Sequence, residues 1–175
     1  DNVDLDQATK NRILVMNTPL GNLEATAELS VGLMFSIMRN IHLANDSTHQ
    51  GKWEKPKFLG TELKGKVLGI VGYGNIGQRV AEICSTIGMK IITNSKSASD
   101  DDLSKFDVKK VSTEDLIKEA DIISLHTKLN DETKYMINKE TISTMKPTSV
   151  IINCARGGLI NCLLYTSDAA DDETS

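Results

Sequence analysis

The sequence has little cysteine, proline or aromatic side chain, and no long hydrophobic run. Its 175 residues include three cysteines, three prolines and one tryptophan. Cys84, Cys154 and Cys162 are odd in number and lack C-x-x-C spacing, so neither a disulfide framework nor a metal site is expected. No apolar stretch approaches the ~18–20 residues of a membrane-spanning helix. This pattern favours a cytoplasmic protein without membrane attachment.

An excess of positive charge is also lacking, because 20 basic residues face 24 acidic ones and the net charge is -4. This balance predicts neither a basic face for nucleic acid nor a polybasic membrane patch. The apolar fraction of 39% is ordinary for a globular protein. A chain of this length is long enough to bury one sizeable core, so we expect one domain or one domain with a fragment of another.

The most informative feature is the segment 67–77, which reads VLGIVGYGNIG. The apolar run 67–71 has the length and composition of a strand. It leads directly into Gly72, Gly74 and Gly77 at G-x-G-x-x-G spacing, and helical periodicity follows over 75–87. A strand, a tight glycine turn and a helix in this order predict dinucleotide binding. A glycine-rich turn without a ligand is the alternative.

Each of the three positions requires glycine for a different physical reason. Gly72 permits the sharp turn out of the strand, and Gly74 leaves the backbone bare for a pyrophosphate. Gly77 lets the helix lie close to the strand. The amides at the helix start, at the positive end of the helix dipole, then face the phosphates.

The elements before this turn are less regular. Residues 13–16 are a short strand candidate. Residues 24–41 read as one long helix whose Leu29, Leu33, Ile37 and Ile41 repeat every four residues, which is typical of a buried core helix. Trp53 lies in an irregular connector, where we expect a packing anchor; stacking on a ligand is the alternative.

From residue 63 onward, strands and helices alternate. We expect strands at 89–93, 108–111, 121–126 and 150–153, and helices beginning at a Ser112 capping box and at Asn138. Residues 97–107, with Asp100 to Asp102, read as a solvated loop. Repeated strand–helix–strand units predict an α/β fold, a Rossmann-type doubly wound parallel sheet with helices on both faces. Residues 162–175 have no apolar period, and we expect them to be disordered.

Beyond the glycine turn, several separate blocks carry a family resemblance. The chain resembles the D-isomer-specific 2-hydroxyacid dehydrogenases, and among them the phosphoglycerate dehydrogenases. The resemblance covers nearly everything from residue 1 to 161. It rests on the glycine turn and on 1–4 (DNVD), 15–22 (VMNTPLGN), 26–29 (TAEL), 51–53 (GKW), 60–63 (GTEL), 126–127 (HT) and 153–158 (NCARGG).

The resemblance implies a division of the chain. Residues 1–18 correspond to a remnant of the family's substrate domain, residues 19–161 to its NAD(P)-binding domain, and residues 162–175 to neither. The chain is therefore expected to be a fragment that is cut at both ends.

The resemblance also assigns residues. Arg156 corresponds to the catalytic arginine, and its planar guanidinium suits bidentate binding of a substrate carboxylate. A surface arginine at a strand end is the alternative. The cofactor contacts implied are Gly72, Gly74, Asn75, Ile76 and Gly77 around the pyrophosphate, Thr127 near the nucleotide, and Cys154 with Arg156 near the nicotinamide.

The family's catalytic histidine and its glutamate fall beyond the point where the resemblance ends. The chain is therefore not expected to catalyse the reaction unaided. His126 corresponds to a cofactor-side position, with a general base as the alternative reading.

At the end of the second strand, the acid that usually bonds the adenine ribose is replaced by Ser95, between Asn94 and Lys96. A serine can bond a ribose hydroxyl but does not repel a 2′-phosphate, and Lys96 can attract one. NAD is expected, and NADP is also possible.

The resemblance implies an NAD(P)-dependent oxidoreductase acting on the CH–OH group of D-2-hydroxy acids, with 3-phosphoglycerate of serine biosynthesis as the first candidate. The alternative is a nucleotide-sensing or corepressor-like protein without catalysis. The partner expected is a small 2-hydroxy or 2-oxo acid. A homodimer through helix 24–41 is expected of the full-length protein.

Overall fold

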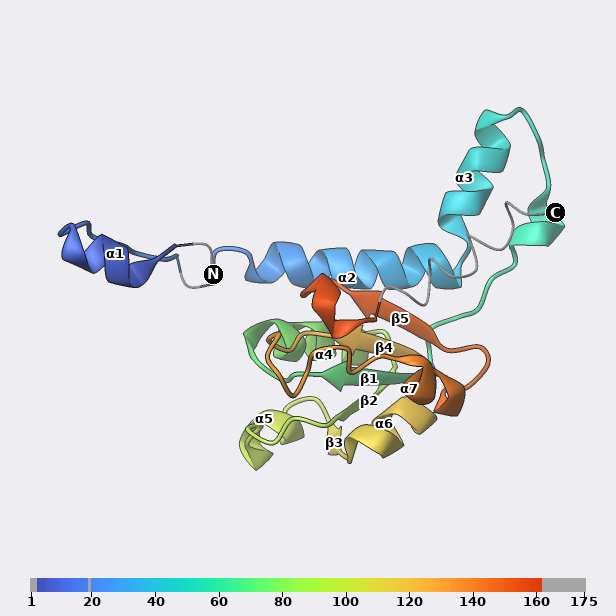
Figure 1. Cartoon of the computed structure of the whole chain (residues 1–175). Helices are drawn as coiled ribbons and strands as arrows, with labels where there is room; N and C mark the ends of the chain where they lie inside the picture. Colours follow the sequence, from blue (N-terminus) through green and yellow to red (C-terminus); the bar gives the residue numbers. More distant parts are fainter. Residues whose placement is uncertain (1–2, 19, 162–175) are drawn as a thin grey trace.

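The computed structural model describes residues 3–18 and 20–161 and is built around a five-stranded parallel sheet (Figure 1). The strand order is β3-β2-β1-β4-β5. The strands are β1 Val67–Val71, β2 Lys90–Thr93, β3 Lys109–Lys110, β4 Ile122–Leu125 and β5 Val150–Asn153. The predicted α/β class and parallel sheet are confirmed, because every strand pair in the ladder is parallel.

Helices cover both faces of the sheet, and alternate strand residues point to each. On one face, α2 (Leu23–Met38), α4 (Asn75–Thr86) and α5 (Asp100–Ser104) pack in one buried cluster with Leu68 and Ile70. On the other face, α6 (Thr113–Glu119) packs with Val71, and α7 (Lys139–Thr144) lies alongside it. Cys84 on α4 is fully buried, and burial raises the pKa of its thiol to about 12.

Asp121 joins the amino ends of two strands. Its carboxylate accepts a hydrogen bond from the Val67 amide at 2.8 Å and one from Lys146 Nζ at 2.8 Å. Burial acts to raise the pKa of this carboxyl, but the bonds from Lys146 and Val67 outweigh burial and lower it. The charged form therefore stabilises the end of the sheet opposite the glycine turn.

Two short helices project from this body. The helix α1 (Leu5–Lys10) lies beyond the start of α2, and α3 (Ile41–His49) rises from its end (Figure 1). A turn of 3-10 helix, η1 (Lys55–Phe58), follows α3, and another, η2 (Gly157–Leu159), follows β5. Within the described ranges, no helix is both long enough and apolar enough to cross a bilayer.

The predictions for the first third of the chain need correction. Residues 13–16 form no strand, and their side chains are exposed, because no neighbouring strand pairs with them there. The long helix ends at Met38, since Asn40 adopts the left-handed conformation (φ 53°) and α3 begins after it. The returning chain occupies the helix end, where the Thr61 amide donates to the Met38 carbonyl at 2.6 Å.

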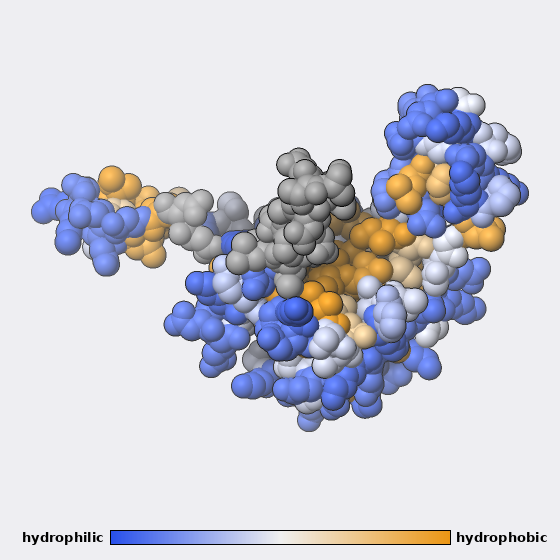
Figure 2. Space-filling model, turned by 45° about the vertical axis from the view of Figure 1, so that its right-hand side comes forward, coloured by the Kyte–Doolittle hydropathy of each residue, from blue (hydrophilic) through white to orange (hydrophobic). Residues whose placement is uncertain are grey.

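The predicted buried stripe on this helix is also wrong. Leu29, Leu33, Ile37 and Ile41 are 38–56% exposed. The face that packs against α4 is instead offset around the helix and consists of Ala27, Ser30, Val31 and Met34, all buried. Small residues on that face let α2 lie close to α4, so the larger side chains point outward. Figure 2 shows apolar surface in this region, between the body and the projecting α3.

Two further local predictions are wrong. Trp53 is 86% exposed and is not a packing anchor. Residues 97–107 are not all loop, because Ser99 caps α5 by accepting from the Asp102 amide at 3.2 Å. The three acids Asp100 to Asp102 form its first turn, where the helix dipole favours negative charge. The helix caps expected at Ser112 and Asn138 are confirmed. The disorder expected over 162–175 lies outside the described residues.

Candidate functional site

The glycine turn is held by contact between backbones. Gly72 follows β1 with φ +91°, a conformation that favours glycine. A Cβ placed on Gly72 would lie 2.7 Å from the Thr127 amide nitrogen. The His126 amide donates to the Val71 carbonyl at 2.7 Å, so the chain leaving β4 runs directly beside the turn.

The other two glycines of the motif differ sharply from each other. A Cβ on Gly77 would lie 2.2 Å from the Gly72 carbonyl oxygen, so no side chain fits there. A Cβ on Gly74 would meet no atom within 4 Å. Gly74 is also the N-cap of α4, and no side-chain cap covers the first amides of that helix. The start of α4 thus combines open space with helix N-terminal amides, which fits the diphosphate of a dinucleotide.

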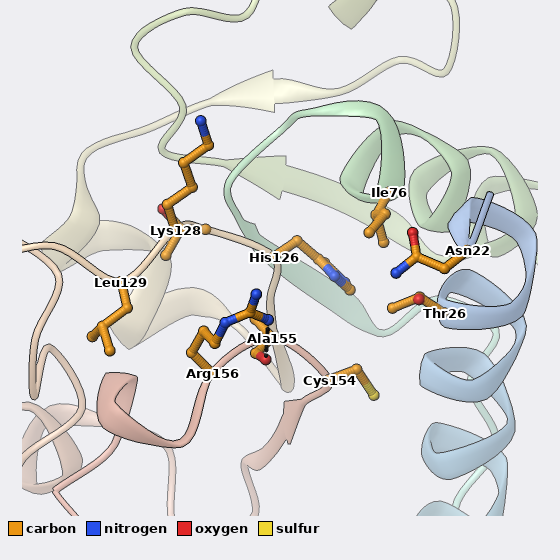
Figure 3. A pocket seen from close by; sticks show the side chains of 10 residues that line it. Asn22, Thr26, Ile76, His126, Lys128, Leu129, Cys154, Ala155 and Arg156 are labelled. Atoms are coloured by element: carbon orange, nitrogen blue, oxygen red, sulfur yellow. Dashed lines mark hydrogen bonds between the residues drawn. The ribbon is translucent and has the colours of Figure 1, made fainter. Parts of the chain in front are cut away.

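A cleft of about 570 Å³ opens beside this turn, within the usual size range for small-molecule sites. It is bounded by the start of α2, the first turn of α4 and the segments that follow β4 and β5 (Figure 3). A hollow of about 230 Å³ adjoins it and reaches Gly74 and Asn75. The residues lining the cleft are Asn22, Thr26, Ile76, His126, Thr127, Lys128, Leu129, Cys154, Ala155 and Arg156.

Arg156 lies just past β5, at the carboxyl edge of the sheet where ligands bind in open α/β folds. Its guanidinium is exposed and points toward the middle of the cleft (Figure 3). Asn153 braces the turn, because its side-chain amide donates to the Arg156 carbonyl at 3.0 Å and its Oδ1 accepts from the Ala155 amide at 3.1 Å. The arginine therefore sits on a backbone held at two points.

The structure brings most of the predicted site residues together. Ile76, Thr127, Cys154 and Arg156 line the cleft. Gly72, Gly74, Asn75 and Gly77 form the turn beside it. Ser95 lies apart, beyond the end of β2 on the other side of β1, with its hydroxyl oxygen 3.3 Å from that of Ser97. The predicted residues thus flank the glycine turn on both sides.

His126 lies between the turn and the arginine. Its Nε2 is 2.8 Å from the Ser124 hydroxyl oxygen, and its ring points toward Ile76, Asn22 and Thr26 (Figure 3). Burial lowers the pKa of this imidazole to about 4, so it is neutral near pH 7. General base catalysis favours a pKa near the working pH, so this environment argues against the alternative reading of His126 as the base.

Five lining residues were not predicted to belong to the site. Asn22 and Thr26 come from the start of α2, Lys128 and Leu129 follow His126 and Thr127, and Ala155 lies between Cys154 and Arg156. Asn22 and Thr26 fall inside two of the blocks that carry the family resemblance, so a signal was present. Their position over the cleft depends on how α2 packs on α4, which those blocks do not specify.

Comparisons with known proteins agree with this geometry. Residues 31–163 match the family described as "D-isomer specific 2-hydroxyacid dehydrogenase, NAD binding domain". The chain is 44% identical over 161 residues to a hydroxypyruvate reductase of Thermotoga maritima and 42% identical to a D-3-phosphoglycerate dehydrogenase of Synechocystis. These matches cover 92% of this chain but only 52% and 29% of the two relatives.

A likeness in structure accompanies the likeness in sequence. The apo structure of D-lactate dehydrogenase from Escherichia coli superposes with a TM-score of 0.88 at 30% identity. That match covers 98% of this chain and 54% of the other. The chain therefore spans about half of these proteins or less.

The buried imidazole predicts a pH-dependent loss of stability. Between the ordinary pKa of about 6.5 and the folded value of about 4, only the unfolded state binds the His126 proton, so acidification favours unfolding. From pH 7 to pH 4.5, the wild type should lose about 2–3 kcal/mol more of its free energy of unfolding than His126→Gln. Urea unfolding followed by circular dichroism measures this difference. The exposed His49→Gln serves as the control, and the same pH dependence in His126→Gln and wild type would contradict the assignment.

Proposed function

Because the chain belongs to the D-isomer specific 2-hydroxyacid dehydrogenase family, we propose that it is the nucleotide-binding part of an oxidoreductase for D-2-hydroxy acids. In this proposal residues 1–18 are a remnant of the substrate domain, and the cleft binds a nicotinamide dinucleotide beside the acid. The observation that carries it is the open space at Gly74 next to the uncapped start of α4.

The glycine turn would hold the diphosphate. The amides of Asn75, Ile76 and Gly77 belong to the first turn of α4, where helix N-terminal donors and the dipole favour negative charge. Gly74 supplies the room. Ser95 lies on the side of β1 away from Arg156, which suits the ribose of the adenosine. Either NAD or NADP fits these contacts.

The other end of the cleft would hold the reacting groups. Arg156 presents an exposed guanidinium that can bind a carboxylate and polarise the adjacent carbonyl. Thr127 and Cys154 line the same cleft. Thr127 would lie near the nucleotide, and Cys154 would lie beside the nicotinamide. A bound nicotinamide supplies or accepts the hydride. His126 is neutral and bonded to Ser124, so its role here is to shape the cleft rather than to transfer the proton.

The substrate we propose is a small D-2-hydroxy acid or its 2-oxo form, with 3-phosphoglycerate and hydroxypyruvate as the two candidates. The names of the relatives support both, and their identities to this chain are nearly equal. Oxidation of 3-phosphoglycerate would place the full-length protein in serine biosynthesis.

Replacement of Gly74 tests the diphosphate site. A Cβ at this position enters open space, so Gly74→Ala should fold and lose no more than about 1 kcal/mol of stability as a poorer N-cap. The methyl group would occupy the room for the phosphate, and NADH affinity should fall at least about tenfold, or 1.4 kcal/mol. Calorimetric titration of the chain measures this. Gly32→Ala, also in open space but on α2, is the control. Unchanged affinity in Gly74→Ala would place the nucleotide elsewhere.

A second test concerns turnover. The chain loaded with NADH should not reduce hydroxypyruvate, because none of the described residues matches the family's catalytic histidine or its glutamate. A positioned general acid or base contributes about 10²–10⁴ to such rates. Absorbance at 340 nm measures NADH oxidation, with a full-length hydroxypyruvate reductase as positive control. Turnover by this chain that is abolished in Arg156→Gln would overturn the expectation that the chain lacks the catalytic acid or base.

The third test concerns self-association, since we also propose that the protein is a homodimer through α2. The exposed side chains of Leu29, Leu33 and Ile37 supply an apolar face on that helix, and Ile41, which is also exposed, begins α3. The wild-type chain should sediment as a dimer, and Leu33→Glu should be monomeric because it buries a charge in the interface. Leu14→Glu, on the segment before α2, should remain dimeric. A monomeric wild type, or a dimer unaffected by Leu33→Glu, would exclude this surface.

A further inference from the structure

The segment after β2 is polar and carries no carboxylate. It reads Asn94, Ser95, Lys96 and Ser97. In dinucleotide-binding folds, an acid at this point accepts hydrogen bonds from the adenine ribose and repels a phosphate on its 2′ oxygen. Without the acid, the repulsion is gone. What the site recognises then depends on the charges and hydrogen-bond donors that surround this segment.

The segment 94–97 is attached to β1 beside the glycine motif. Strands β1 and β2 pair in a register that places Ile70 beside Thr93. The Thr93 hydroxyl donates to the Ile70 carbonyl at 2.8 Å and accepts from the Ser95 amide at 3.3 Å. Continued by two residues, the register brings Ser95 level with Gly72. A nucleotide whose diphosphate lies on the glycine turn would therefore have its adenosine ribose at this segment.

Two hydroxyls and a lysine from another strand lie together at this segment. The hydroxyl oxygens of Ser95 and Ser97 are 3.3 Å apart. Lys110 lies on β3 beside Thr93, and its Nζ donates to the Lys96 carbonyl at 3.3 Å. An ammonium group has three donors, so this bond leaves two for a ligand. Lys110 is 15 residues away from Ser95 in the sequence, and only the sheet register brings them together.

The charge at this segment is positive, because Lys96 and Lys110 both lie there. Among the residues that the structure describes, neither Lys96 nor Lys110 forms an ion pair with a carboxylate. The acids nearest to Ser95 and Lys96 along the chain are those of α5, and Asp107, which is exposed, lies shortly before Lys110. Asp102 is engaged by Lys105 at 2.8 Å and by the Ser99 hydroxyl at 2.7 Å. Asp100 and Asp101 are exposed, where salt screens their charge.

We infer that Ser95, Lys96, Ser97 and Lys110 form a subsite for the 2′-phosphate of an adenine nucleotide, so that this chain binds NADP(H) in preference to NAD(H). The two hydroxyls donate hydrogen bonds to the phosphate, and the two ammonium groups neutralise it. The inference rests on the proposed function, because the position of the ribose follows from a diphosphate on the glycine turn. It adds a residue of β3 to the cofactor site.

The first experiment compares two nucleotides on the full chain. NADPH and NADH are titrated by calorimetry at one fixed salt concentration, and wild type should bind NADPH at least about tenfold more tightly. Binding of both with NADH equal or tighter overturns the 2′-phosphate subsite alone. Binding of neither overturns the proposed function as well, so the two failures are distinguishable. A second pair of probes, 2′,5′-ADP and 5′-AMP, should show the same preference without a nicotinamide.

The second experiment uses charge variants. Lys110→Ala should weaken NADPH binding about 3–10-fold and change NADH binding less than about twofold. The control is Lys109→Ala, the same charge change on the same strand, because Lys109 lines a different hollow together with Met89 and Lys90. Equal effects of the two variants would overturn the role of Lys110.

The third variant restores the acid. Ser95→Asp should weaken NADPH binding at least about tenfold by like-charge repulsion while NADH binds as well as before or better. The circular dichroism spectrum of each variant confirms that it is folded. A Ser95→Asp chain that keeps the wild-type preference for NADPH would show that the phosphate lies elsewhere and would overturn the subsite.

Discussion

The arrangement of the site depends on the close approach of two pieces of backbone, at Gly77 and Gly72. A side chain at Gly77 would lie 2.2 Å from the Gly72 carbonyl oxygen, and one at Gly72 would lie 2.7 Å from the Thr127 amide. Helix α4, strand β1 and the chain leaving β4 are therefore held together without intervening side chains. Arg156 lies just past β5, on the β4 side of β1, and Ser95 lies beyond the end of β2, on the opposite side of β1. The positions of both relative to the glycine turn therefore depend on this contact.

The three glycines of the motif have different roles. Gly72 and Gly77 are closed to any side chain by their neighbours, so their requirement concerns folding. Gly74 is open, and its backbone conformation (φ -80°) suits any residue, so the fold itself does not require glycine there. A glycine where the fold tolerates larger residues indicates that the space is kept for something else. One short motif thus carries both a folding constraint and a binding one, at separate positions.

Much of the fold was predictable from local patterns. Short apolar runs predicted the ends of β1 and β5 correctly, and a serine and an asparagine predicted the starts of α6 and α7. Predictions failed where the outcome depends on packing partners. The four-residue repeat on α2 identified an apolar face, but the small residues Ala27 and Ser30 determine which face meets α4. The apolar periodicity also continues through Asn40, where a left-handed residue ends the helix.

In the site, Arg156 and the glycines could be predicted from sequence motifs. The contact between Lys110 and Lys96 was not, because it depends on the sheet register.

Helix α2 connects the cleft to the outer surface. Its first turn supplies Thr26, and the preceding cap residue Asn22 lines the same cleft. One turn further along, Ala27, Ser30 and Val31 lie against α4 with almost no exposed area, and the Ser30 hydroxyl donates to the Thr26 carbonyl at 2.8 Å. The opposite side of the same helix carries the exposed Leu29, Leu33 and Ile37. Because close-packed interfaces resist small displacements, we expect α2 and α4 to keep their relative position. A partner that covers the outer face of α2 would therefore restrain the position of Asn22 and Thr26 over the cleft, although it touches neither.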